Sequence, residues 1–320
     1  MNRLTVSVVV VLAACALVVG ASARQSGDSA YTPKRINKAI ELLEAGQPVY
    51  YFQFPGGGYD EGKELAQTWA DAIGYNVEQA PFSALQFKAF MQGLIDGGPT
   101  RSGHRTPAVI VTLPVGGIDE MTVRANYWMV EQVLAAGAHG VLMVHMREEG
   151  AARAFVQASR YPLAPKTPGI GEGLRGSGGQ GLAAQMWGIT AAEYLRIADP
   201  WPLNPDGELL MGFKPEDQVA LEVIDQTMAV PGIGMVEWGP ADMMMSFGLI
   251  RTPGSSYPPV VTDARDRILD VARRNNVVFS EVGTNAGNVI ERVDDGILFH
   301  FANEEAARIG REHTERVMPY

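Results

Sequence analysis

The feature that most constrains the fold of this chain is a regular alternation of short apolar runs with helical patterns. Eight runs are typical of buried strands and cover residues 48–54, 74–79, 108–113, 140–145, 209–213, 233–238, 277–281 and 297–301. Helical patterns separate them, which indicates a parallel sheet. Eight such units favour a single-domain (β/α)8 TIM barrel over an open doubly wound sheet.

The helices expected between these strands follow apolar residues at helical spacing. They cover residues 36–44, 61–73, 84–95, 123–136, 147–158, 191–197, 215–228 and 263–275, with a last helix beginning at Glu304. Residues 161–180 are rich in glycine and proline and are expected to form a long loop. The sequence shows no internal repeat and no boundary of a second domain.

The first 23 residues have the pattern of a secretory signal peptide and are left out of the fold. Arg3 precedes an apolar run from Leu4 to Gly20, and small residues follow at 21–23. A polar linker is expected over 24–33, and the barrel over 34–320. We therefore expect an exported protein, periplasmic or secreted. An uncleaved membrane anchor and lipid anchoring through Cys15 are alternatives, but the apolar run continues past Cys15 and argues against the second.

Composition narrows the function further. The formal net charge is −10 and the sequence contains no basic cluster. This argues against nucleic acid as a partner and against an anionic membrane surface, apart from a signal or lipid anchor. Cys15 is the only cysteine, so a chain cleaved after residue 23 has no thiol, disulfide or cysteine metal ligand.

The stretch from Pro231 to Gly248 is the first candidate for a functional site. An expected strand ends at Trp238, and Gly239-Pro240 permits a tight turn before a methionine-rich helical segment. Asp242 lies in the first turn of that segment. Its carboxylate either caps the helix or belongs to a polar site at the strand end.

Other polar side chains follow the expected strands at the same end of the barrel, where (β/α)8 enzymes carry their chemistry. The strand-end positions are Gln53, Glu78, Gln79, Leu113, His145, Lys214, Glu237, Asp242, Glu281 and His300. We expect residues 78, 79, 214 and 242 to converge at one rim. In the alternative interpretation, Glu237 and Glu281 form salt bridges, and His145 and His300 are satisfied barrel residues.

Several motifs in register resemble the HpcH/HpaI aldolase and citrate lyase β-subunit family. They are Gly239-Pro240-Ala241-Asp242, Asn76-Val77-Glu78-Gln79-Ala80-Pro81, Ser159-Arg160-Tyr161-Pro162, Gly173-Leu174-Arg175-Gly176, Trp187 and Tyr194-Leu195. The resemblance runs from about Ala72 to His300. It implies a (β/α)8 barrel, a small-molecule carboxylate as ligand, and a homo-oligomer with sites near subunit contacts.

Carried over residue by residue, the resemblance gives an altered site. Family members bind a divalent metal (Mg or Mn) through a Glu and the Asp of the turn; Asp242 is kept, but Lys214 stands in the Glu position. The metal is therefore doubtful, and we expect a Lys214–Asp242 ion pair in its place. Gln79 and Asn76 replace the family's His base and its Asp. Leu113 stands where the resemblance places an Arg.

These substitutions leave three functional hypotheses. The first is an aldolase-like carbon–carbon lyase acting on a small 2-oxo or hydroxy acid, with Lys214 providing electrostatic stabilisation or a Schiff base. The second retains a metal on Asp242 with new ligands such as Glu237 or a histidine. The third is a non-catalytic exported binder of small carboxylates. The expected site residues are Glu78, Gln79 and Lys214 for catalysis and Gly239, Ala241, Asp242, Trp238 and Arg175 for substrate binding.

Overall fold

The computed structural model describes residues 31–252 and 255–320, and Tyr31–Tyr320 forms one compact unit. The expected signal peptide, Cys15 and most of the expected linker lie outside the described residues. The expectations on targeting therefore stay predictions. Among the helices that the structure describes, none combines the length and the apolar character needed to cross a bilayer.

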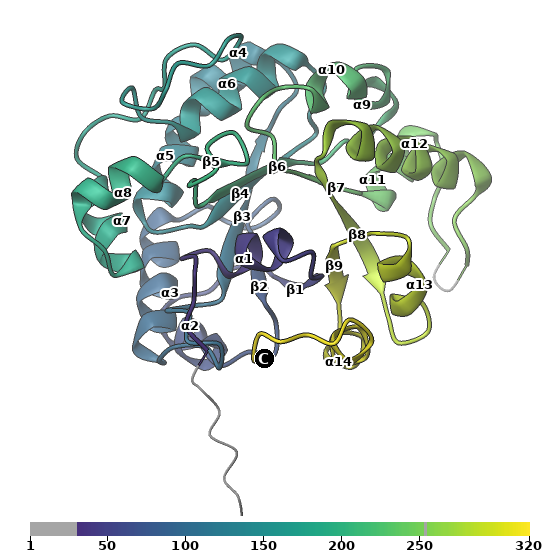
Figure 1. The fold of residues 1–320 in the computed structure, drawn as a ribbon. Coiled ribbons are helices and arrows are strands. Elements are labelled where there is room, and N and C mark those ends of the chain that lie inside the picture. Colours follow the sequence, from purple (N-terminus) through teal and green to yellow (C-terminus); the bar gives the residue numbers. More distant parts are fainter. Residues whose placement is uncertain (1–30, 253–254) are drawn as a thin grey trace, which may run out of the picture. The chain divides into compact units, whose positions relative to one another are not determined.

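The strands form a closed parallel barrel (Figure 1). The strands are β1 (Val49–Phe54), β2 (Ala72–Asn76), β3 (Ala108–Gly116), β4 (Gly140–Val144), β5 (Pro200–Trp201), β6 (Leu209–Phe213), β7 (Met235–Glu237), β8 (Val278–Thr284) and β9 (Phe299–Ala302). They pair in the order β4-β3-β2-β1-β9-β8-β7-β6, and pairing of β4 with β6 closes the barrel. The short β5 pairs only with β6. The predicted single-domain (β/α)8 barrel is confirmed.

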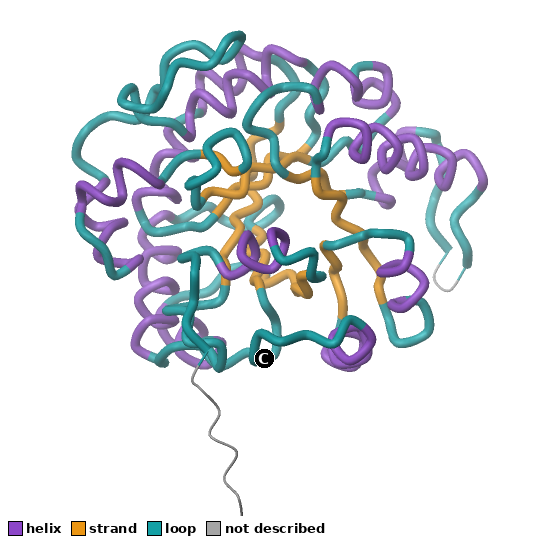
Figure 2. Tube along the Cα trace, viewed as in Figure 1, coloured by secondary structure: helices purple, strands orange, loops and turns teal. Residues whose placement is uncertain are grey.

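The helices surround this ring of strands (Figure 2). They are α1 (Lys38–Glu44), α2 (Tyr59–Leu65), α3 (Ala84–Asp96), α4 (Glu120–Asn126), α5 (Trp128–Ala135), α6 (Glu149–Ser159), α7 (Gln180–Trp187), α8 (Ala191–Ile197), α9 (Gln218–Glu222), α10 (Ile224–Met228), α11 (Pro240–Ser246), α12 (Pro259–Asn275), α13 (Val289–Asp294) and α14 (Glu304–His313). Side chains that accept a backbone N–H fix the start of several of them. These caps are Asn37, Ser83, Asp119, Thr190, Asp217 and Asn303.

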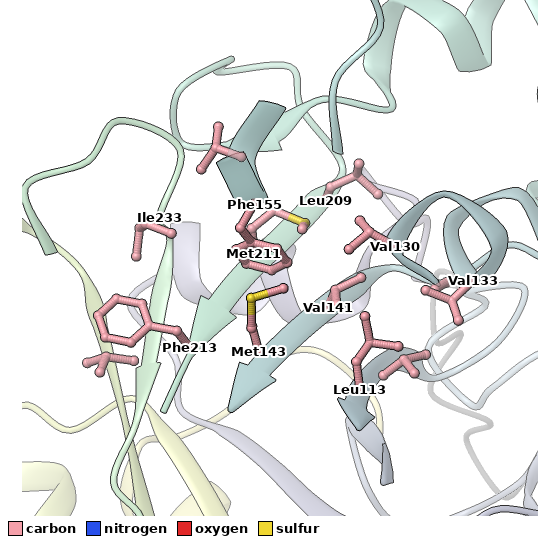
Figure 3. Close-up of a cluster of buried hydrophobic side chains, with 14 of the residues drawn as sticks. Leu113, Val130, Val133, Val141, Met143, Phe155, Leu209, Met211, Phe213 and Ile233 are labelled. Atoms are coloured by element: carbon pink, nitrogen blue, oxygen red, sulfur yellow. The ribbon is translucent and has the colours of Figure 1, made fainter. Parts of the chain in front are cut away.

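The barrel strands are buried on both faces, which explains their nearly continuous apolar sequences. Successive residues of a strand face opposite sides. In β3, Leu113 packs in the core between strands and helices, whereas Thr112 faces the barrel interior. Figure 3 shows the helix-facing core, with Met143 of β4 and Met211 of β6 beside Phe155 of α6.

The structure corrects several expected boundaries. The helix expected over 61–73 is wrong in its second half, because α2 ends at Leu65 and β2 begins at Ala72, which pairs with Tyr51 of β1. The helices expected over 123–136 and 215–228 are each divided, at Tyr127 and Val223 respectively. Helices α7 and α13 and the short β5 were not expected.

A buried ionic cluster ties the end of the chain to the start of β2. The Asp71 carboxylate is fully buried and lies 3.0 Å from Lys38 Nζ, 3.1 Å from Arg311 Nη2 and 2.7 Å from Arg316 Nη1. These cations hold the pKa of Asp71 below its ordinary value despite its burial. The cluster precedes β2, so it lies at the opposite end of the strand from Glu78 and Gln79.

Candidate functional site

The turn after β7 positions two carboxylates, and its glycine is required for this. A Cβ atom built on Gly239 would lie 2.6 Å from Glu216 Oε1 and 2.7 Å from its Cγ. Any side chain at this position would therefore displace Glu216. Pro240 begins α11, where its missing N–H costs nothing. Across residues 31–252 and 255–320, no hydrogen bond to the Asp242 carboxylate is formed, so Asp242 does not act as the cap of α11.

A cavity of about 470 Å³ opens at the carboxyl ends of the strands. It is lined by Gln53, Pro55, Asn76, Glu78, Gln79, Ala80, Lys214 and Asp242. The four side chains expected to converge, at positions 78, 79, 214 and 242, thus lie around one space. The sequence predicted a strand over 74–79, but β2 ends at Asn76. Glu78 and Gln79 therefore belong to the loop after β2.

Lys214 lies at the centre of a group of carboxylates. Its Nζ is 2.9 Å from Glu78 Oε2, 3.3 Å from Glu216 Oε1 and 3.9 Å from Glu237 Oε1. Burial alone would lower the pKa of the ammonium, but these three carboxylates together raise it. Lys214 is therefore held charged, and a protonated amine cannot attack a carbonyl carbon to form a Schiff base.

The expected Lys214–Asp242 ion pair is wrong: within the described part of the chain, the ion pairs of Lys214 are with glutamates only. The physical reason is that three glutamates already surround the ammonium. Glu216 stands two residues beyond Lys214, in the loop before α9, and its side chain turns back against Gly239. It thereby supplies a carboxylate beside the Lys214 ammonium.

Glu216 is the site residue that sequence reasoning missed. We expected it within a helix over 215–228, but α9 begins only at Gln218. Burial raises the pKa of Glu216 to about 8, and the charges of Glu78 and Asp242 oppose the lowering effect of Lys214. The sequence signal that was available is an acid two residues after a strand-end lysine, separated from it by Pro215.

Glu237 lies deeper, in the barrel interior. Its side chain accepts hydrogen bonds from Tyr51 Oη and, at 3.4 Å, from Gln53 Nε2. Burial raises the pKa of Glu237. Burial and the neighbouring Glu237 both raise the pKa of Tyr51, so the hydroxyl remains a donor. Glu237 contacts Lys214 from the barrel interior, with its Oε1 3.9 Å from Nζ. It is not among the residues that line the cavity.

The amide side chains on the other side of the cavity form a short network. Asn76 donates to Gln53 Oε1 at 3.2 Å and accepts from the Glu78 backbone N–H at 2.9 Å. Asn76 therefore fixes the loop that carries Glu78. Gln79 is exposed at the rim, where its amide faces the cavity.

His145 places an imidazole nitrogen near the carboxylates of Glu78 and Glu216. It has a φ of +50°, a conformation that is strained for a non-glycine residue. Its backbone N–H donates to Glu216 Oε2 at 3.3 Å, and its Nδ1 lies 3.4 Å from the same oxygen. Ligand atoms of Glu78, His145 and Glu216 lie within 4.8 Å of one another, so this set has the chemistry of a cation site.

Lys214 and the carboxylates around it act in opposite directions on a divalent metal bound to this set. A magnesium ion binds carboxylate oxygens at about 2.1 Å, so an ion on Glu78 Oε2 would lie at most about 5 Å from the ammonium. Repulsion between charges of +2 and +1 at that distance is about 7 kcal/mol at an effective dielectric of about 20. Glu78, Glu216 and Asp242 bring three negative charges to the same rim, which offset this repulsion, so carboxylate ligands for a divalent cation are present beside Lys214.

Other expected site residues lie elsewhere. Trp238 is buried in the core between strands and helices. Arg175 is buried among the helices, where it donates to Tyr194 Oη at 2.9 Å and stacks on Tyr161. Leu113 faces the helices too, so it does not occupy a cavity position. None of these three lines the described cavity.

His300 and Glu281 have the structural roles that the alternative interpretation gives them. His300 is buried and stacked on Tyr50, and burial lowers the pKa of its imidazole to about 4. Glu281 forms an ion pair with Arg265. Neither of them lines the described cavity.

Known proteins resemble this chain in sequence and in fold. No model of a protein family matches the chain. A hydroxypyruvate/pyruvate aldolase of Roseovarius nubinhibens is 28% identical over 56% of this chain and 59% of that protein. One of Deinococcus radiodurans is 27% identical over 71% of this chain and 80% of that protein. The match thus spans less than two thirds of the first relative's length.

Solved structures share the barrel. An HpcH/HpaI aldolase/citrate lyase family protein from Burkholderia cenocepacia has a TM-score of 0.64 at 20% identity, covering 88% of this chain and 98% of that one. The citrate lyase β-subunit of M. tuberculosis, complexed with oxaloacetate and magnesium, has a TM-score of 0.50 at 13% identity, covering 86% of this chain and 100% of that one. At these identities the likeness establishes the fold alone.

Proposed function

We propose, from the confirmed resemblance of this chain to the HpcH/HpaI aldolase and citrate lyase β-subunit family, that it is an aldolase-like carbon–carbon lyase acting on a small 2-oxo or hydroxy acid. Its relatives are aldolases that act on hydroxypyruvate or pyruvate by name. The observation that carries the proposal is the convergence of Glu78, Lys214 and Asp242 around one cavity at the carboxyl ends of the barrel strands.

In the proposed reaction, the Glu78 carboxylate transfers the proton and the Lys214 ammonium stabilises negative charge. Glu78 accepts the proton of the hydroxyl group at C4 of a 4-hydroxy-2-oxo acid. The C3–C4 bond breaks, an aldehyde leaves, and the electron pair moves into the C2–C3 enolate. The charged Lys214 stabilises the negative oxygen of that enolate electrostatically. Glu78 then returns the proton to C3, which gives the 2-oxo acid and restores the carboxylate. Gln79 and Asp242 orient the substrate.

The test follows enolisation and carbon–carbon bond formation separately. The purified protein is incubated with pyruvate in D₂O to follow loss of the methyl protons by NMR, and with hydroxypyruvate and a short aldehyde to detect an aldol product. We expect Glu78→Gln to lower both rates by about 10²-fold or more. Asp206→Asn, a matched change of an exposed carboxylate, should leave both rates unchanged. Wild-type rates in Glu78→Gln would refute the assigned role.

A second candidate function is a non-catalytic binder of small carboxylates. The observation that favours it is the amide lining of the cavity: Gln53, Asn76 and Gln79 line it, and no histidine of the described residues does. A binder would show a rise in Tm with pyruvate or oxalate. The absence of deuterium exchange and of aldol product in the same samples would separate it from an enzyme.

We further propose that the protein is exported and that it forms a homo-oligomer. The signal-peptide pattern over residues 1–23 supports an exported protein, and N-terminal sequencing of the mature chain from a periplasmic extract tests it. A homo-oligomer is proposed on the family resemblance. Light scattering of the purified protein measures the oligomeric state directly, and a monomer at all concentrations would contradict this part.

A further inference from the structure

We infer that Tyr51 is a positioning residue of this site: through the Glu237 carboxylate, it holds the Lys214 ammonium where a 2-oxo acid in the cavity can meet it. The inference deepens the proposed lyase function and rests on it for the role of Lys214. A chain of polar contacts in the barrel interior, from β8 and β1 through β7 to the end of β6, carries it.

The chain of contacts begins at the Tyr51 hydroxyl. Tyr51 belongs to β1, and its side chain lies in the barrel interior beside Phe299, only 3% exposed. Its Oη donates to Glu237 Oε2 and accepts a hydrogen bond from Ser280 Oγ at 3.4 Å. Because Ser280 donates to Tyr51, the single hydrogen of the tyrosine hydroxyl is left for Glu237. The direction of this hydrogen bond is therefore fixed.

The Glu237 carboxylate connects this hydroxyl to the ammonium. A buried carboxylate needs partners, and Glu237 has Tyr51, Gln53 Nε2 at 3.4 Å and Lys214 Nζ at 3.9 Å. Tyr51 and Gln53 extend from the same strand, whereas the ammonium lies at the end of a flexible stem. Loss of the tyrosine donor would leave Glu237 short of one partner. The ammonium is the group that can move towards it, and this movement draws it away from the cavity.

The same contacts reach the proposed base. Gln53 Oε1 accepts from Asn76 Nδ2 at 3.2 Å, and Asn76 Oδ1 accepts the Glu78 backbone N–H at 2.9 Å. Lys214 Nζ lies 2.9 Å from Glu78 Oε2 and so closes a ring that runs through Glu237, Gln53 and Asn76. The base and the ammonium are thus placed relative to each other by one ring of contacts, which the tyrosine hydroxyl anchors in the barrel interior.

Two neighbouring tyrosines provide a matched pair of variants. Tyr51 is not among the residues that line the cavity, and Tyr51→Phe removes its hydroxyl while keeping the ring and the charge of the site. Tyr50 is also buried, but it faces the helices on the other side of β1. Its hydroxyl has no hydrogen-bond partner among the residues that the structure describes. Tyr50→Phe is therefore the control for removing a buried hydroxyl from this strand.

The experiment measures oxalate binding by calorimetry, in buffer with a fixed concentration of Mg²⁺, for wild type, Tyr51→Phe, Lys214→Met and the double variant. We expect Tyr51→Phe to weaken oxalate binding about tenfold, the size of one hydrogen bond to a charged group. Tyr50→Phe should bind like wild type. In the Lys214→Met background, Tyr51→Phe should have no further effect, because the hydroxyl acts through the ammonium.

A second measurement uses the exchange of pyruvate protons in D₂O. Tyr51→Phe should lower kcat about tenfold and change KM by less than about threefold, because the ammonium acts mainly on the negative charge that forms in the transition state. A merely structural role of Tyr51 would lower the Tm and leave both the oxalate Kd and kcat of the folded protein unchanged.

The outcomes separate this inference from the proposed function. An oxalate Kd that Tyr51→Phe leaves unchanged, or a loss that persists in the Lys214→Met background, overturns the inference even where wild type is a lyase. Wild-type protein that binds no oxalate overturns it as well. A loss that vanishes without Lys214 supports it, even where no exchange or cleavage occurs and the lyase proposal fails. Should Lys214→Met not fold, Lys214→Gln serves as the background, and the comparison of Tyr51→Phe with Tyr50→Phe still decides between the two roles.

Discussion

Replacing Lys214 with methionine tests how far the carboxylate cluster depends on its cation. Methionine keeps the apolar stem but removes the ammonium that lies 2.9 Å from Glu78 and 3.3 Å from Glu216. Removing one partner of a buried ion pair costs about 3–5 kcal/mol, because the remaining charges are left uncompensated. For a chain of this size each kcal/mol lowers Tm by roughly 2 °C. We expect a decrease of about 6–10 °C at neutral pH.

The pH dependence of this loss is its signature. Without the ammonium, the pKa values of Glu216 and Glu237, which burial already raises, rise further above that of an unfolded glutamate. The folded state then binds protons more tightly than the unfolded state, so stability falls as pH rises from the unfolded pKa to the folded one. The deficit of Lys214→Met should therefore shrink towards about pH 5 and grow towards about pH 8.

Thermal melts followed by circular dichroism across this pH range measure the effect. Lys88→Met makes the same change of charge at an exposed position of α3 and should melt like the wild type. A deficit that is equal at all pH values, or that stays below about 1 kcal/mol, would refute the reasoning from uncompensated buried charge.

The remaining predictions concern the neighbours of Lys214. Gly239→Ala should cost about 1–3 kcal/mol in urea melts, because its Cβ would displace Glu216, whereas Gly176→Ala, with open space around its Cβ, should be neutral. In wild type, the Glu216 pKa is raised from 4.5 to about 8, so stability falls as pH rises through that window; Glu216→Gln should flatten this slope. Asp242→Asn should change stability by less than about 0.5 kcal/mol while abolishing product in the aldol assay; a large loss of stability would mean that Asp242 is structural.

The fold could be predicted from the sequence because each barrel strand is buried on both faces. The run 209–213 is apolar throughout and the run 108–113 is apolar except for Thr112, and proline and glycine separate such runs from the helices. The prediction of a helix over 61–73 was wrong in its second half, because the apolar residues there suit a strand as well as a helix. Only pairing with β1 makes Ala72 and the residues after it a strand.

The sequence predicted the location of the site more accurately than the contacts between its side chains. Strand ends converge in a barrel, so residues 78, 79, 214 and 242 were expected together. The sequence did not show in which direction each side chain points. Glu216 turns back towards Gly239, and Lys214 forms its ion pairs with glutamates instead of with Asp242. Arg175 has a local motif but packs on Tyr161, which sequence spacing does not reveal.

The pairing of the first barrel strand with the last has a consequence for synthesis. Because β1 hydrogen-bonds to β9, the cylinder cannot shut until nearly the whole polypeptide has left the ribosome. Until then β1 has a free edge, and forming contacts between segments so distant along the chain is slow. A factor that keeps the nascent chain from aggregating would act during this interval.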